Sequence, residues 1–138
     1  MQWVRDQVDT YERTGGREAG TLRETGIPVI IVSMRGATSG SVRKIALMRV
    51  EHEGEYALVA SYGGSPQHPA WYHNLVAHPR IEVTWKNQRK TLLARLASPE
   101  EKAAVWPLCC QHYKDFDLYQ RRTGRDIPVF ICEPAGVA

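Results

Sequence analysis

Apolar and β-branched residues gather first over 27–34, the most hydrophobic stretch of the chain, and this pattern is typical of a buried strand. Two similar stretches follow, over 43–51 and 56–62, each after a short segment of small and polar residues. Because these links are too short for a parallel crossover, the sequence predicts an antiparallel meander of the three strands.

The second half of the chain shows a two-residue period. Ile81, Val83 and Trp85 alternate with polar residues, as expected for a strand with one buried face. A polar turn at 87–88 then predicts a hairpin. Strands are predicted here over 80–86, 89–97 and 127–132.

Helix signals are clearest around Ser98. Ser98 can cap a helix, Pro99 suits the first turn and Glu101 completes a capping box. This helix is predicted to run to about His112. Pro69 is expected at the first position of another helix, because its missing N–H would be unpaired there. The shorter helices are predicted over 6–13, 70–77 and 115–123.

Six strands with three or four short helices indicate an α+β fold. Strands that are mostly linked by hairpins and return at the C-terminus favour a closed or split barrel. With 138 residues, 43% of them hydrophobic, the chain has the size and balance of one globular domain. We therefore expect a single domain over 1–138, with an N-terminal helix and loop over 1–26 and a barrel core over 27–134.

Composition narrows the function classes. The net charge of +3 is small and spread along the chain, so it does not favour nucleic acid as a partner. Cys109, Cys110 and Cys132 form no paired motif, which fits reduced thiols in the cytoplasm. No apolar run approaches the ~20 residues that span a bilayer, and the mixed charges near the N-terminus favour at most weak peripheral contact with a membrane. We expect a monomer or a weak homodimer.

A loop over 35–44 offers anion-binding chemistry. Gly36 and Gly40 stand among three hydroxyl residues, so backbone N–H groups can point into a concavity. Arg43 and Lys44 supply positive charge at its rim. Because neighbouring strand residues point to opposite faces, only one of these two cations should face a ligand. The alternative is a flexible hairpin tip with a solvated basic pair.

Three further segments could border a flat ligand. Glycines at 63–64 would let a planar group approach the backbone, and the helix start at 69–75 offers free N–H donors. Aromatic residues spaced at i, i+3 and i+6 would line one side of a helix and wall a pocket; they are Tyr113, Phe116 and Tyr119. The alternatives are a plain strand exit, a core-packing helix and a stripe of core aromatics.

Catalysis by side chains alone has no visible signature. The five histidines include no i, i+4 pair on one predicted helix, so no metal site is predicted. The chain has no Gly-x-Ser-x-Gly nucleophile motif, and Cys109 and Cys110 lie within a predicted helix, away from a basic cluster. A bound cofactor would have to supply the chemistry.

These segments, in their order and spacing, resemble the deazaflavin-dependent nitroreductase family. The matching motifs are Gly36-x-x-x-Gly40-x-x-Arg43, Ala60-Ser61-x-Gly63-Gly64, Pro69-x-Trp71-Tyr72-x-Asn74-Leu75 and Ile127-Pro-Val. The resemblance covers 27–134 and implies a mostly antiparallel split β-barrel, related to the FMN-binding barrels, with short flanking helices. It also implies coenzyme F420, an 8-hydroxy-5-deazaflavin with a phosphate and a polyglutamate tail.

By position, the resemblance implies three sets of contacts. Those with the phosphate or tail would come from Ala37, Thr38 and Ser39. Those along the cofactor would come from Arg43, Lys44, Ile45, Ala46, Leu47 and Met48, and those bordering the ring from Val59, Ala60, Ser61, Tyr62, Ala70, Trp71, Tyr72, His73 and Asn74. The residues facing the substrate would be Tyr113, Phe116 and Tyr119.

The resemblance implies an oxidoreductase, in which reduced F420 donates a hydride to an electron-poor acceptor: a quinone, an enone, a coumarin-like lactone or a nitroaromatic. Tyr113 and Ser61 are the candidate catalytic residues, as hydrogen-bonding groups that orient or polarise what is bound. The alternatives are an FMN-dependent reductase of the same barrel type and a non-catalytic deazaflavin-binding protein.

The chain departs from the family pattern at two positions. Thr38 and Tyr62 stand where family members commonly or often carry a basic residue, so two cations for the cofactor tail are missing. Arg35 or Lys44 could replace them. Because an exposed ion pair contributes about 0–1 kcal/mol, these changes predict a weakened tail contact and a retained site.

Overall fold

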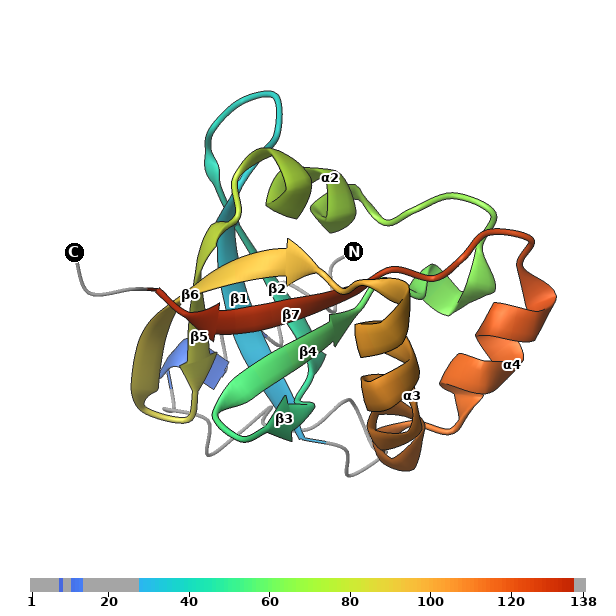
Figure 1. Cartoon of the computed structure of the whole chain (residues 1–138). Helices are drawn as coiled ribbons and strands as arrows, with labels where there is room; N and C mark the ends of the chain where they lie inside the picture. Colours follow the sequence, from blue (N-terminus) through green and yellow to red (C-terminus); the bar gives the residue numbers. More distant parts are fainter. Residues whose placement is uncertain (1–7, 9–10, 14–27, 136–138) are drawn as a thin grey trace.

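The computed structural model describes residues 8, 11–13 and 28–135, and its centre is a seven-stranded sheet (Figure 1). The strands are β1 (Val29–Arg35), β2 (Val42–Met48), β3 (Glu51–His52), β4 (Glu55–Val59), β5 (Arg80–Trp85), β6 (Gln88–Leu96) and β7 (Val129–Pro134). Their order in the sheet is β2-β1-β5-β6-β7-β4-β3, and every pair of neighbours is antiparallel.

The two edge strands of this sheet follow one another along the chain. β2 ends at Met48 and β3 begins at Glu51, so three Cα steps, about 11 Å at most, separate them. Seven strands ~4.8 Å apart would be about 29 Å wide if the sheet were flat. The sheet therefore curls until its edges meet. This geometry confirms the expected split barrel with short flanking helices.

The predicted meander is wrong in its third strand. β1 and β2 pair as expected, from Val29 opposite Met48 to Arg35 opposite Val42. The predicted strand over 43–51 is broken after Met48, which makes seven strands in place of six, and β4 pairs with β7 instead of β2. Short links decide that strands run antiparallel, but they do not decide which edge of a closing sheet a later strand joins.

The predicted ends of two strands also differ from the structure. β4 stops at Val59, and the chain then forms a short turn of 3₁₀ helix, η1 (Tyr62–Gly64). Tyr62 has a φ of +45° and Gly64 a φ of +77°, and neither angle fits a strand. β7 begins at Val129, later than expected.

The helices lie where the sequence predicts them. They are α2 (Ala70–Ala77), α3 (Pro99–His112) and α4 (Asp115–Arg122). The capping box is confirmed, since Ser98 Oγ accepts from Glu101 N at 3.2 Å and the Glu101 carboxylate accepts from Ser98 N at 2.9 Å. Pro69 is the N-cap of α2 and not its first residue, because its ψ of 156° is extended.

Of the predicted helix over 6–13, the described residues 8 and 11–13 are helical, and the predicted loop over 17–26 lies outside the described residues. Val8 and Tyr11 pack on the outer face of β1, against Val29 and Ile31. No helix in the described part of the chain is long and apolar enough to cross a membrane.

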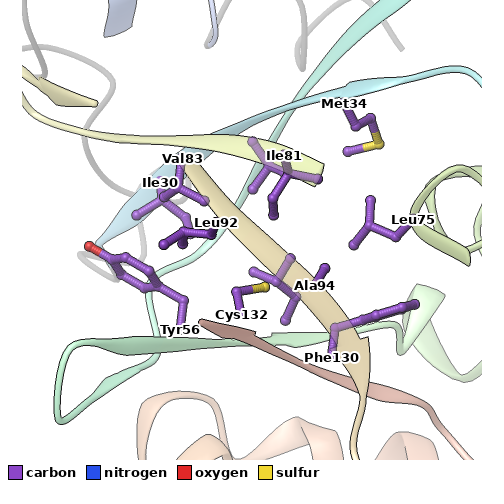
Figure 2. Close-up of a cluster of buried hydrophobic side chains, with 12 residues drawn as sticks. Ile30, Met34, Tyr56, Leu75, Ile81, Val83, Leu92, Ala94, Phe130 and Cys132 are labelled. Atoms are coloured by element: carbon purple, nitrogen blue, oxygen red, sulfur yellow. The ribbon is translucent and has the colours of Figure 1, made fainter. Parts of the chain in front are cut away.

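Inside the barrel lies one cluster of apolar side chains, which point toward one another from several strands and from α2 (Figure 2). Ile30, Leu92, Phe130 and Leu75 are each at most 1% exposed. Leu75 belongs to α2, so its burial seats that helix on the barrel. α2 is thereby held beside the loop between β1 and β2 (Figure 1).

A second cluster joins α3 and α4 to the sheet. Cys109 of α3 and Phe116 of α4 pack with Val129 and Ile131 of β7. Burial raises the pKa of the Cys109 thiol to about 12, so this thiol stays protonated and unreactive near neutral pH. The role of these helices here is to place aromatic side chains next to the barrel.

Candidate functional site

The loop at 36–41 is shaped first by its own backbone. Gly36 N donates to the Ser41 carbonyl at 2.8 Å, and Gly40, with a φ of +70°, donates to the Gly36 carbonyl at 2.9 Å. Arg35 donates from Nη1 to the Gly40 carbonyl at 3.0 Å. These bonds make a compact turn in which a Cβ at position 36 would lie 2.9 Å from Ser39 Oγ, so a larger residue there would displace the Ser39 side chain.

The same loop is tied to α2 through Asn74. Its Oδ1 accepts from Ala37 N at 2.8 Å. Among the described residues, the N–H groups of Thr38 and Ser39 donate to no protein acceptor. Two adjacent free donors in a glycine-rich turn are suited to an anion.

The two basic residues at the loop rim have different surroundings. Lys44 Nζ lies 2.9 Å from both carboxylate oxygens of Glu12. Arg43 has no carboxylate within 4 Å in the described part of the chain, and its Nε lies 3.5 Å from where a Cβ on Gly36 would stand. Arg43 is therefore the cation that faces the loop. Lys44 is already paired with Glu12, whereas Arg35 donates to a neutral carbonyl and keeps its positive charge.

A groove of about 1190 Å³ runs from this loop along β2 and beneath α2. Thirteen of the residues expected to contact the cofactor line it: Ala37, Thr38, Ser39, Arg43, Lys44, Ile45, Ala46, Leu47, Tyr62, Ala70, Trp71, His73 and Asn74. The structure therefore brings together the glycine loop, one strand and one helix that are separated in the sequence.

A smaller cavity of about 370 Å³ adjoins the groove. It contains all three residues expected to face the substrate, Tyr113, Phe116 and Tyr119, together with Ser61, Met48 and Val59. Four residues line both spaces: Leu47, Tyr62, Pro69 and Trp71. The groove and the cavity thus share a wall, and a ligand in one would lie next to a ligand in the other.

The aromatic side of the smaller cavity is partly polar. The hydroxyls of Tyr113 and Tyr119 are 3.1 Å apart, and the Tyr113 and Phe116 rings meet edge to face at 5.2 Å. The hydrogen bond with Tyr119 and burial raise the pKa of the Tyr113 phenol, so it stays protonated near neutral pH and can donate a hydrogen bond. Tyr113 is the C-cap of α3 and not part of α4, so the expected helical stripe is wrong for it, although its ring joins the same wall.

Two of the expected contacts lie outside both spaces. Ala60 is fully buried, and its N–H donates to the Pro128 carbonyl at 2.9 Å. Tyr72 stacks on His68 with ring centroids 4.1 Å apart and packs against Phe130. Both residues support the walls and do not form them.

Sequence reasoning missed several wall residues. Pro69, which was expected only to start a helix, lines both spaces, and Val50 and Ala57 line the smaller cavity. The break in the strand after Met48 turns Val50 toward the cavity, and no local pattern signals that break. Among the described residues, no group of three His, Cys, Asp or Glu side chains is placed to hold a metal.

Comparison with known proteins identifies the family. The family described as F420H(2)-dependent quinone reductase matches residues 3–134. The chain belongs to this family. The expected F420-dependent oxidoreductase class is therefore confirmed, and with it coenzyme F420, in preference to FMN, as the cofactor of the family.

Individual relatives agree with this assignment. The chain is 32% identical over 134 residues to the F420H(2)-dependent quinone reductase Rv1261c of Mycobacterium tuberculosis, which covers 95% of this chain and 89% of the relative. A solved F420-H2 dependent reductase, FDR-A, is 42% identical, with a TM-score of 0.73 over 77% of this chain and 94% of its own. A second structure, titled a domain-swapped dimer, is 38% identical, with a TM-score of 0.75 over 96% and 98% of the two chains.

Proposed function

We propose that this family member reduces a quinone-like acceptor bound in the smaller cavity, with reduced F420 in the adjoining groove. The observation that carries the proposal is the shared wall formed by Leu47, Tyr62, Pro69 and Trp71. Transfer between two ligands requires that their reacting atoms come into contact. Residues that line both a large groove and a smaller aromatic cavity place the two spaces side by side, which such contact needs.

The phosphate end of the cofactor fits the glycine loop. Thr38 and Ser39 offer backbone N–H donors, and Arg43 offers a guanidinium with no carboxylate partner among the described residues. Donors of this kind bind phosphate and carboxylate oxygens well. Because position 38 is threonine, we propose that Arg43 is the principal cation for this end.

The remaining groove fits a long ligand with a flat apolar part. Its volume of about 1190 Å³ exceeds what a quinone-sized molecule fills, since pockets for drug-sized ligands are about 300–1,000 Å³. Leu47, Ala70 and Trp71 provide apolar surface for the ring system. Asn74 positions the glycine loop, because its side-chain oxygen accepts a hydrogen bond from the Ala37 N–H.

When bound, the reduced deazaflavin supplies a hydride equivalent, the chemistry that this chain's side chains lack. The chain's own part is to hold the acceptor and to respond to its charge. The protonated Tyr113 phenol, oriented by Tyr119, can donate to an acceptor oxygen as negative charge develops there. Ser61 supplies a second polar group in the same cavity, and buried Phe116 excludes water from it.

The test is a fluorescence titration of the purified protein with F420, followed by oxidation of reduced F420 in the presence of menadione. We expect saturable binding and turnover that depends on the quinone. Binding without turnover across quinones and nitroaromatics would identify a non-catalytic deazaflavin-binding protein. A protein that is yellow as purified and does not bind F420 would identify an FMN enzyme.

The remaining expectations concern partners and location. We propose a cytoplasmic protein that is a monomer or a weak homodimer; that a structural relative is titled a domain-swapped dimer favours the dimer. Sedimentation velocity over a range of concentrations measures the oligomeric state, and flotation with liposomes tests for weak membrane contact.

A further inference from the structure

The turn at 61–65 forms one side of the acceptor cavity, and its backbone is unusual. Ser61 and Tyr62 line the cavity, and Tyr62 is 61% exposed, with a φ of +45°. A non-glycine residue in this left-handed region is disfavoured, and it persists only when its surroundings hold it. Two hydrogen bonds lie within the turn itself: Gly64 N donates to the Ser61 carbonyl at 2.9 Å, and Ser65 N donates to the Tyr62 carbonyl at 3.0 Å. The other contacts that hold the turn come from outside it.

The guanidinium of Arg125 supplies the missing contacts from a distant part of the chain. Its Nε donates to the Ser65 carbonyl at 2.9 Å, its Nη1 to the Ala60 carbonyl at 3.1 Å and its Nη2 to the Ser61 carbonyl at 2.7 Å. No carboxylate in the described part of the chain lies within 4 Å of it. The planar fork of arginine can reach three carbonyls at once, which a lysine ammonium does less well.

Arg125 is itself fixed to α4, which carries the opposite wall of the cavity. Gln120 Nε2 donates to the Arg125 carbonyl at 2.9 Å, and Thr123 Oγ1 donates to the Ser65 carbonyl at 3.3 Å. A Cβ on Gly64 would lie 3.2 Å from the Tyr119 backbone, so the turn and α4 are in direct contact. Figure 1 shows η1 and α4 side by side.

We propose that Arg125 is a positioning residue for the acceptor site. It ties the turn carrying Ser61 and Tyr62 to the helix carrying Phe116 and Tyr119, and so it sets the spacing between the two sides of the cavity. This role rests on the proposed function, because it assigns the cavity to the acceptor. Arg125 lines neither the cavity nor the groove, so it acts through the turn and not by contact with a ligand.

His68 makes this clamp sensitive to acid. Its Nδ1 lies 3.1 Å from Arg125 Nη1, and since a guanidinium only donates, Nδ1 must accept and the ring must be neutral. The ring faces Tyr72 and His73 of α2. It also borders a separate pocket of about 320 Å³, whose charged lining residues are Lys102 and Asp126. Burial, the charge of Arg125 and the proximity of His73 lower the pKa of His68. Protonation in acid would place a second cation against the guanidinium and remove the acceptor.

The test compares Arg125→Lys, Arg125→Gln and the matched control Arg121→Gln, an exposed arginine of α4. For each variant we would measure the thermal midpoint, the Kd for F420, and kcat and KM for menadione well below the midpoint. Arg125→Gln should lower kcat/KM for menadione about tenfold, and Arg125→Lys should recover only part of this loss. The Kd for F420 should change less than the acceptor parameters. A merely structural role would lower the midpoint and leave kcat/KM unchanged.

Two results separate this inference from the proposed function. If the wild-type protein neither binds F420 nor reduces menadione, the proposed function and the acceptor role of Arg125 both fail. Arg125→Lys is the more conservative change, and it serves as the test if Arg125→Gln does not fold. If the wild type is active and Arg125→Lys has the same kcat/KM as Arg121→Gln, the positioning role alone is overturned.

A pH profile provides a further readout. The wild-type kcat/KM for menadione should fall in acid as His68 is protonated. His68→Asn offers an amide oxygen as acceptor and does not titrate, so this acid limb should weaken or disappear. An identical limb in His68→Asn would remove His68 from the clamp.

Discussion

The two ends of the combined site are built in opposite ways. At the glycine loop, Thr38 and Ser39 present backbone donors, and Arg43 has no carboxylate partner among the described residues. At the aromatic end, Phe116 is 2% exposed, and the Tyr113 and Tyr119 hydroxyls bond to each other. The first end contributes little to the fold, so its groups remain available to a ligand. The second end belongs to the hydrophobic core.

This difference predicts how each end responds to substitution. Changes at the glycine loop should alter ligand binding and leave stability almost unchanged. Changes at the aromatic end should alter both, because the same atoms pack the core and wall the cavity. The comparison fails if the two properties do not separate in this way.

The largest effect is expected at Phe116. Phe116→Ala removes a ring that packs against Trp106 and Tyr113, and it should lower the free energy of unfolding by about 3–5 kcal/mol. Leu118→Ala, on the exposed side of the same helix, should change it by less than about 1 kcal/mol. Chemical denaturation measures both values. Equal losses in the two variants would show that Phe116 is not a core residue.

A smaller effect, confined to the acceptor, is expected at Tyr113. Tyr113→Phe keeps the ring and removes the donor, so kcat/KM for menadione should fall about 10- to 100-fold, with little change in the Kd for F420. Steady-state kinetics and the fluorescence titration measure the two quantities. Tyr72→Phe is the control, because Tyr72 lies outside both the groove and the cavity. A wild-type kcat/KM in Tyr113→Phe would remove Tyr113 from catalysis.

At the other end, Arg43→Gln should weaken F420 binding without unfolding the protein. Loss of one charge-assisted contact predicts about a tenfold higher Kd and a weaker dependence of Kd on salt. The thermal midpoint should stay that of the wild type. The control is Arg89→Gln, whose wild-type guanidinium lies 3.9 Å from Glu82 and which lines neither the groove nor the cavity; it should cost no more than about 1 kcal/mol of stability and leave the Kd nearly unchanged. A Kd in Arg43→Gln equal to that in Arg89→Gln would contradict the assignment.

The smallest effect lies away from both ends, at the capping box of α3. Hydrogen bonds from Arg95, and then from Ser98 N, lower the pKa of Glu101 to about 2. Because this pKa is below its unfolded value, the carboxylate stabilises the fold above the ordinary glutamate pKa, and this contribution is lost as the pH falls toward 2. Thermal midpoints of wild type and Glu101→Gln should therefore converge in acid. Glu100→Gln, in the same helical turn, is the control. The Kd for F420 should be the same in Glu101→Gln as in the wild type.

Much of the site could be predicted because its signals are local. Gly36 and Gly40 mark a turn, Arg43 stands at the start of the strand that follows it, and Ser98 caps α3. Each of these features depends on backbone angles or side-chain spacing within a few residues, and the sequence shows both directly.

What sequence reasoning missed depends on residues far apart in the chain. The break after Met48 and the pairing of β4 with β7 instead of β2 accompany barrel closure. The left-handed turn at Tyr62 is held by contacts from Arg125. The clamp from Arg125 to the Ala60, Ser61 and Ser65 carbonyls joins positions about 60 residues apart, as the sequence separations of its bonds show. A basic residue in a polar stretch carries no local sign of such a partner.

The sequence by itself therefore determined the three helices, most of the strands, the glycine loop, the aromatic triad and, through resemblance, the family. Only the tertiary structure placed the groove at the glycine loop next to the cavity at the aromatic triad. It also decided which of the expected residues line both spaces. The physical reason is that local propensity acts over a few residues. The order of strands around a barrel, by contrast, is set by burying one apolar interior while pairing every edge, a property of the whole chain.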